Sequence, residues 1–166
     1  MDGGLVWIRP EDGRGPGAGN DDLVALVRGA VPGEWSGEVA AGPVTCPSCG
    51  DDAYEVSRGE CFCTGCCIPL GIANGLDCGP GGLDCHPGGF AWRLVPSAGP
   101  SPASGGAFVP PGGPRCPDGH DVFHVAVSFA LGSDGRARRL SAALRCEVDG
   151  ALHLYVNDAR VVPVEA

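Results

Sequence analysis

Two C-x-x-C pairs constrain this chain more than any other feature. They are Cys46/Cys49 and Cys63/Cys66, and thirteen residues separate them. Each pair can form a tight turn, a knuckle, that directs two thiolates to one point, and two facing knuckles supply the tetrahedral sulfur set of a structural zinc ion. The spacing therefore predicts a Zn²⁺ site formed by Cys46, Cys49, Cys63 and Cys66.

The segment between the two pairs has the pattern of a short β-hairpin. Residues 54–56 can form a strand, residues 57–59 a turn and residues 60–63 a returning strand. A hairpin carried between two knuckles is a zinc ribbon, and we expect a ribbon module over residues 44–95. A further strand is expected over 90–95, where aromatic and aliphatic residues alternate.

Part of this stretch resembles the N-terminal zinc ribbon of transcription factor IIB, where C-P-x-C-G precedes R-G-E-x-x-C-x-x-C. The matching positions are Cys46, Pro47, Cys49, Gly50, Arg58, Gly59, Glu60, Cys63 and Cys66. The resemblance covers roughly residues 46–72. It implies that the four cysteines bind zinc and that the ribbon docks on RNA polymerase. The paired cyclin-like helical repeats of that family do not follow here.

Length and composition limit how much of the chain can form a core. The 166 residues include 29 Gly and 16 Pro, a proportion at which disordered segments are expected. We expect a flexible N-terminus over 1–43 and an uncharged Pro/Gly-rich linker over 96–114. Because the remaining pieces are small, bound metal would compensate for a limited core.

One short helix is predicted within the N-terminal segment. Asn20, Asp21 and Asp22 can cap it, LVALVRGAV forms it, and Gly29 and Pro32 end it. We expect this helix to lie as a lid over the ribbon; contact with a partner is the alternative.

The C-terminal segment 115–166 has the alternation of an antiparallel β-meander. We expect half-buried strands over 123–131, 139–146 and 152–156, with a fourth around Val161. His124 and His153 fall on the polar face of their strands, which predicts exposure. The fold class is therefore small and mostly β, a zinc ribbon plus a meander joined by Gly/Pro-rich loops.

The meander also resembles a second, degenerate ribbon. CPDGH stands where a first knuckle would be and CEVDG where a second would be. A second metal site could therefore use Cys116, His120 and Cys146 with either Asp149 or His153. The alternative is a metal-free meander with packed cysteines. A G-L-D-C-x-P sequence that occurs twice allows two interpretations of Cys78, Cys85 and His86, as ligands or as loop residues.

Charge argues against nucleic acid as a partner. The net charge is −9, whereas proteins that grip phosphates present basic surfaces. The one basic cluster is expected to be a solvated strand edge, with an acidic partner as the alternative; it comprises Arg136, Arg138, Arg139 and Arg145. The chain starts without the pattern of a signal peptide and has no apolar run of membrane length. We expect a cytoplasmic protein.

No catalytic motif of the HExxH, GxSxG, phosphate-loop or dinucleotide type is present. We therefore expect no enzymatic activity, and we favour a zinc-binding adaptor that contacts a protein partner, with a role in transcription. One alternative is thiol redox or zinc release through the crowded Cys61, Cys63, Cys66 and Cys67. Another is a nucleic-acid-binding zinc finger.

Overall fold

The computed structural model describes residues 7–8, 20–46, 48–57, 60–67, 69–71, 77–79, 82–84, 92–95 and 113–163. The N-terminal half contains α1 (Asp21–Gly29), β1 (Val39–Pro43), β2 (Ala53–Ser57), β3 (Glu60–Cys63) and β4 (Pro69–Gly71). It is followed by β5 (Asp77–Gly79), β6 (Gly82–Asp84), β7 (Trp92–Val95), β8 (Val122–Leu131), β9 (Ala137–Cys146) and β10 (Leu152–Pro163). The mostly-β prediction is confirmed.

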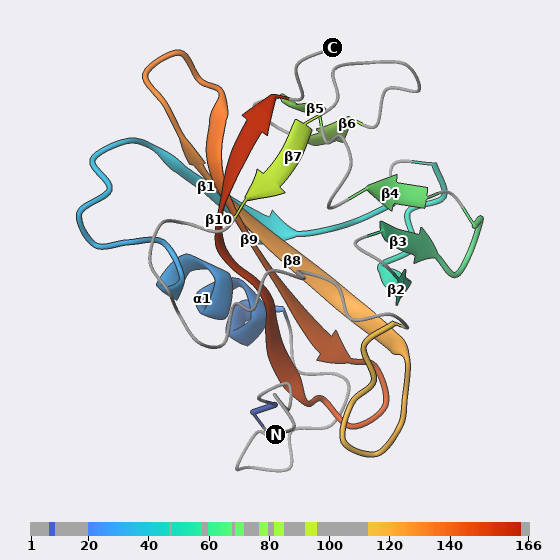
Figure 1. Cartoon of the computed structure of the whole chain (residues 1–166). Coiled ribbons are helices and arrows are strands. Elements are labelled where there is room, and N and C mark those ends of the chain that lie inside the picture. The colour runs from blue at the N-terminus through green and yellow to red at the C-terminus, as the bar shows by residue number, and fades with distance from the viewer. Residues whose placement is uncertain are drawn as a thin grey trace.

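Most of the strands belong to one antiparallel sheet (Figure 1). Its order is β4-β3-β2-β8-β9-β10-β7, β1 pairs with β8 as well, and β5 and β6 form a separate hairpin. The predicted ribbon contributes β2, β3 and β4, and the predicted meander contributes β8, β9 and β10. The two segments are thus hydrogen-bonded into the same sheet, while the linker is outside the described residues up to position 112.

One edge of β8 is shared by β1 and β2. The N–H of Val44 donates to the carbonyl of Val125, and the next position along β8, His124, pairs with Ala53. Residues 45–52 therefore leave the edge of β8 and return to it one position later. This excursion is the first C-x-x-C knuckle, so β8 anchors both of its ends.

The meander has longer strands and one strand fewer than expected. Instead of ending before a separate fourth strand, β10 runs on to Pro163 with two register shifts. Asp158 has a φ of 48°, and its backbone N–H donates to the Oγ of Ser141 at 2.9 Å. A β-bulge that is hydrogen-bonded to β9 therefore replaces the expected break between the third and fourth strands.

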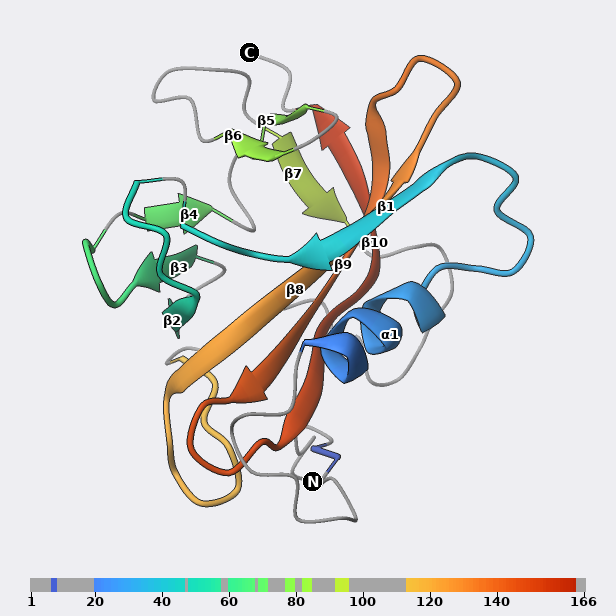
Figure 2. The same cartoon turned by 180° about the vertical axis from the view of Figure 1, so that it is seen from behind.

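Helix α1 packs on the meander, so the prediction of a lid over the ribbon is wrong. Figures 1 and 2 place α1 and the ribbon on opposite sides of the molecule. Leu23 and Val27 of the helix are fully buried against Ala126 and Ala143 of the sheet. The small side chains of Ala126 and Ala143 let the helix approach the sheet closely. The middle of β8 is consequently buried on both faces, where a half-buried strand was predicted.

Polar contacts join both ends of α1 to the sheet. Ser128 Oγ donates to the carbonyl of Val27 at 2.8 Å, and this carbonyl in the last turn also accepts a longer bond from the N–H of Ala30 at 3.3 Å. At the other end Asn20 is the N-cap residue, but its side chain makes no capping bond. Its Oδ1 instead accepts from Arg145 Nη2 at 2.9 Å.

The opposite face of the sheet carries the larger core, and it includes residues that were expected on the surface. His153 is only 6% exposed. The ring of Trp7 lies 4.9 Å from the His153 ring and 5.7 Å from that of Phe123, between centroids. His124 is also largely covered, with its side chain 14% exposed. The predicted exposure of both histidines is wrong, because Trp7, which adjoins the β-bridge between Ile8 and Leu152, covers the first and the knuckle loop covers the second.

The arginines of the basic cluster do not form a strand edge, because β9 lies between β8 and β10. Arg138 pairs with Asp134 at 2.7 Å and Arg139 with Asp158 at 2.5 Å. Arg139 also lies over the ring of Trp35. Much of the cluster's charge is thus engaged within the molecule. Among the described residues, no helix has the length and apolar character of a membrane span.

Candidate metal centre

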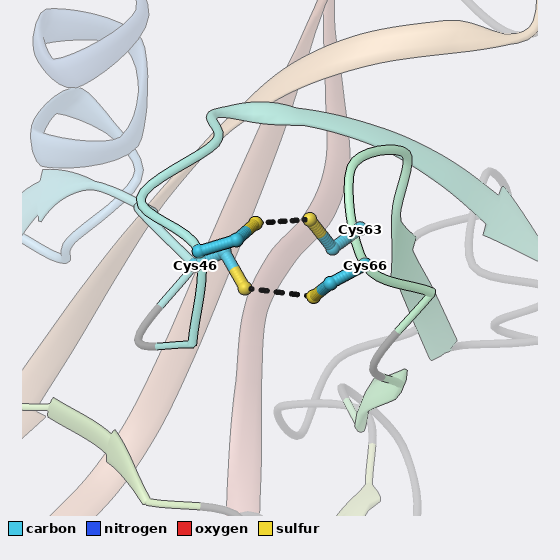
Figure 3. A group of neighbouring side chains, drawn as sticks. Cys46, Cys63 and Cys66 are labelled. Carbon is cyan, nitrogen blue, oxygen red and sulfur yellow. Dashed lines mark hydrogen bonds between the residues drawn. The ribbon is translucent and has the colours of Figure 1, made fainter.

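The four cysteines of the two C-x-x-C pairs converge. Cys46 Sγ lies 3.5 Å from Cys66 Sγ, Cys49 Sγ lies 3.4 Å from Cys63 Sγ, and all four sulfurs are within 4.8 Å of one another. Figure 3 shows Cys63 and Cys66 approaching from one side and Cys46 from the other. A tetrahedral ion with Zn–S distances of about 2.3 Å needs sulfurs about 3.8 Å apart. The cluster therefore has the dimensions of a four-cysteine metal centre.

Backbone hydrogen bonds shape both knuckles. In the first, the N–H of Gly50 donates to the carbonyl of Cys46 at 2.9 Å; in the second, the N–H of Cys67 donates to that of Cys63 at 2.8 Å. The donor residue has a positive φ in both, 78° for Gly50 and 61° for Cys67. Glycine adopts this conformation freely, whereas a cysteine there is strained. The extra cysteine after the second pair thus occupies the position that glycine fills in the first.

Three residues that the sequence reasoning did not single out join the knuckles. Asp51 Oδ2 accepts from Thr64 Oγ1 at 3.1 Å, and the same hydroxyl reaches the carbonyl of Ala53. Gly65 packs closely against the Asp51 side chain and Cys49. A Cβ at this position would be 2.8 Å from Asp51 Oδ2 and 3.2 Å from Cys49 Sγ. The only sequence indication of these roles is their position next to the cysteines of the two C-x-x-C pairs.

The thiols differ in their ease of ionisation. The backbone N–H of Cys49, aided by that of Ser48 and the neighbouring thiols, lowers the pKa of Cys46 to about 6 despite partial desolvation. For Cys49 the N–H of Asp51 lowers the pKa, but the contact with Cys63, desolvation and the other sulfurs outweigh it and raise the pKa to about 12. Of these two thiols, Cys46 is therefore the one that ionises more readily.

The remaining cysteines of the central stretch lie outside this group. Cys61 is 1% exposed and belongs to the apolar core, and Cys67 is exposed. Cys78 lies in β5, and Cys85 and His86 lie outside the described residues, so their predicted alternatives stay predictions. The eight cysteines whose side chains the structure describes are free thiols, without disulfides.

The residues predicted for a second site also come together. Cys116, His120, Cys146 and Asp149 offer ligand atoms that all lie within 4.8 Å of one another. Between the two choices for the fourth position, the structure brings Asp149 to this group, while His153 packs beside Trp7.

No known family model, curated protein or solved structure matches this chain. The likeness to the transcription factor IIB ribbon therefore depends on the local motif alone.

Proposed function

We propose that this is a non-catalytic zinc-binding protein in which an ion bound by four cysteines holds a ribbon in shape for contact with a protein partner. The observation that carries the proposal is the convergence of four sulfurs from two knuckles. Four thiolates complete a tetrahedron and leave no position for a substrate or an activated water, which is the arrangement of structural zinc. The centre would stabilise the fold and take no part in a reaction.

The location of the cluster supports a stabilising role. Cys46 and Cys63 are buried in the same apolar cluster as Tyr54 and Phe123. Bound metal would therefore tie the short β2–β3 hairpin to the core of the whole sheet. Apparent zinc affinities in comparable small modules amount to roughly 10–16 kcal/mol at neutral pH.

A protein is the partner that the charges favour. The net charge of −9 suits a basic protein surface and opposes duplex nucleic acid. Glu55 on β2 and Glu147 beside the meander's second knuckle are exposed and available to such a surface. The IIB-like motif suggests a transcription-related adaptor. That role and a cytoplasmic location are both part of this proposal.

A zinc-release role is the second candidate, favoured by the exposed thiol of Cys67 next to the ligand Cys66. In that role hydrogen peroxide would take two electrons from two thiolates of the cluster and two protons from solvent. One disulfide and two waters would form, and the ion would leave.

Two cysteines of β3 provide a matched test. Cys61 and Cys63 are both 1% exposed, but only Cys63 lies in the sulfur cluster. We expect Cys63→Ser to lose one zinc per chain by metal analysis and to lose protection of residues 46–71 in hydrogen exchange. Cys61→Ser should keep its zinc. Equal zinc content in the two variants would contradict the proposal.

The two candidate functions differ in their response to oxidation. The adaptor should bind its partner unchanged after mild peroxide treatment, whereas the release protein should lose zinc stoichiometrically with disulfide formation and regain it on reduction. Tight binding to duplex DNA at physiological salt would contradict the choice of a protein partner, which depends on the net charge.

A further inference from the structure

The C-terminal hairpin repeats the ribbon's strand pairing residue by residue. In the ribbon Tyr54 pairs with Cys63, and in the meander Phe123 pairs with Cys146. The bond that follows is repeated as well: Thr64 N–H donates to the carbonyl of Ala53 at 3.0 Å, and Glu147 N–H donates to that of Val122 at 3.1 Å. Cys146 therefore holds the structural position of Cys63.

The knuckle after this strand is repeated too. Gly150 N–H donates to the carbonyl of Cys146 at 3.0 Å, as Cys67 N–H does to that of Cys63, and Gly150 has a φ of 75°. Counting along these matched knuckles, Asp149 stands where Cys66 stands. The first knuckle of the meander, between Cys116 and His120, is closed by its own bond from Cys116 N–H to the carbonyl of His120 at 2.9 Å.

The side chains of this second pair of knuckles point at a common centre. Cys116 Sγ lies 3.1 Å from Asp149 Oδ2 and 3.2 Å from His120 Nδ1. His120 Nδ1 lies 3.6 Å from Cys146 Sγ and 3.4 Å from Asp149 Oδ2. Tetrahedral zinc with sulfur, nitrogen and oxygen ligands requires separations of roughly 3.4–3.8 Å, so modest outward shifts would admit the ion.

Asp149 is held ready to act as a one-oxygen ligand. Its Oδ1 accepts from the N–H of Ala151 at 2.9 Å, which leaves Oδ2 directed at the sulfurs and the imidazole.

The burial pattern also matches the first centre. Cys116 and Cys146 are buried, as Cys46 and Cys63 are. The second member of each pair is more exposed to solvent: Cys49 and Cys66 in the first group, His120 and Asp149 in the second. Apolar packing alone accounts for two buried cysteines. It does not account for an imidazole and a carboxylate that converge on the same sulfurs.

We propose that Cys116, His120, Cys146 and Asp149 bind a second divalent ion of the zinc class. Compared with the four-cysteine centre, two soft thiolates are replaced by a nitrogen and a harder oxygen ligand, which lowers the preference for zinc and the affinity. The protein would then carry one tightly held ion and one that exchanges readily. This site does not depend on the ribbon's ion, because no ligand is shared.

Cobalt substitution and metal counting on the full chain test the proposal. We expect wild type to bind two Co²⁺, and the second equivalent to add about half the thiolate charge-transfer absorption of the first, since two sulfurs bind it and not four. A chelator should remove the second ion at a concentration at least tenfold lower. Native mass spectrometry should count two zinc ions in the zinc-loaded protein.

Three variants make the assignment specific. Asp149→Asn keeps an acceptor for Ala151 N–H but loses the anionic ligand, and His120→Ala loses the nitrogen; both should lose the weaker ion and keep the other. Asp149→Cys restores the ribbon-type ligand, so it should bind the second ion at least tenfold more tightly than wild type. This gain cannot arise from misfolding.

The outcomes separate this proposal from the proposed function. A single ion that is lost in Cys49→Ser and kept in Asp149→Asn would overturn the second site and leave the first. A single ion kept in Cys49→Ser and lost in His120→Ala would overturn the four-cysteine centre and leave the second site. If Asp149→Cys gains no affinity, Asp149 is not a ligand and the proposal is wrong.

Discussion

Tyr54 of the ribbon and Phe123 of the meander are direct cross-strand partners, and both side chains are fully buried. In its own hairpin, each aromatic residue also pairs with the cysteine that begins the second knuckle: Tyr54 with Cys63, and Phe123 with Cys146. The two hairpins therefore meet through equivalent residues in an antiparallel pair, as two copies related by an approximate two-fold axis would. This contact places the two sulfur-containing centres on one continuous core.

Shortening Phe123 should weaken both halves. We expect Phe123→Ala to lower the free energy of unfolding by about 3–5 kcal/mol, because a fully buried aromatic ring leaves a cavity. Denaturant unfolding followed separately by zinc release and by far-UV circular dichroism should show both transitions move together. Phe129→Ala, on the same strand but only partly buried, should cost less. A shift confined to the meander would show that the contact does not couple them.

A methyl group at Gly65 should disturb the four-cysteine centre. The Cβ of the new alanine would lie 2.8 Å from Asp51 Oδ2 and 3.2 Å from Cys49 Sγ. Both distances are too short for carbon, so the Asp51 carboxylate must shift and the Cys49 sulfur must give slightly. We expect Gly65→Ala to weaken zinc binding at the ribbon by at least tenfold in a chelator competition. The equivalent position in the meander is Val148, which is 57% exposed, and Val148→Ala should leave metal binding unchanged. Similar affinities for wild type and Gly65→Ala would refute the close packing.

Glycine should be better than cysteine at position 67. The φ of 61° strains any residue with a Cβ, and its relief outweighs the extra freedom that glycine has in the unfolded chain. We expect Cys67→Gly to raise the free energy of unfolding by about 0.5–1 kcal/mol. Cys67→Ser should be neutral and Cys67→Val destabilising, all with full zinc content. Loss of zinc in Cys67→Ser would mean that the ligand assignment is shifted by one residue.

Helix α1 should depend on one hydroxyl. Ser128→Ala leaves the carbonyl of Val27 with only the longer bond from Ala30 N–H, which should cost about 0.5–1.5 kcal/mol. Hydrogen exchange should show faster exchange in residues 21–29 while the ribbon is unaffected. Ser133→Ala, at an exposed turn, should have no effect. Unchanged exchange in the helix would show that this hydrogen bond contributes little.

Metal affinity at the four-cysteine centre should increase with pH. Above pH 7 Cys46, with a pKa of about 6, is already a thiolate in the metal-free protein, whereas Cys49, with a pKa of about 12, still carries its proton. Binding must displace that proton, so each proton released raises the affinity by about tenfold per pH unit. Chelator competition at pH 7, 8 and 9 measures the slope. A flat profile would mean that binding displaces no thiol proton, and it would contradict the four-cysteine centre.

Local patterns were sufficient to predict β2, β3, β8 and β9 and the two groups of side chains that come together. Knuckle spacing predicted which four sulfurs would meet, because each knuckle is a turn of a few residues, and alternation predicted β8 and β9. The position of α1 depends on two small residues, Ala126 and Ala143, whose role is visible only once the strands are paired. The burial of His153 depends on Trp7, which is remote in sequence. Strand β1 was missed because VAAGP has neither alternation nor bulk.

The order in which the elements pair has a consequence for synthesis on the ribosome. The strand pairs of β2, β3 and β4 all lie within residues 53–71, so this hairpin and its thiols can leave the exit tunnel and capture an ion early. Helix α1 and β1 emerge sooner still, yet their packing surface on β8 is translated about a hundred residues later. An early-loaded ribbon would offer the nascent chain a folded edge on which β8 can dock.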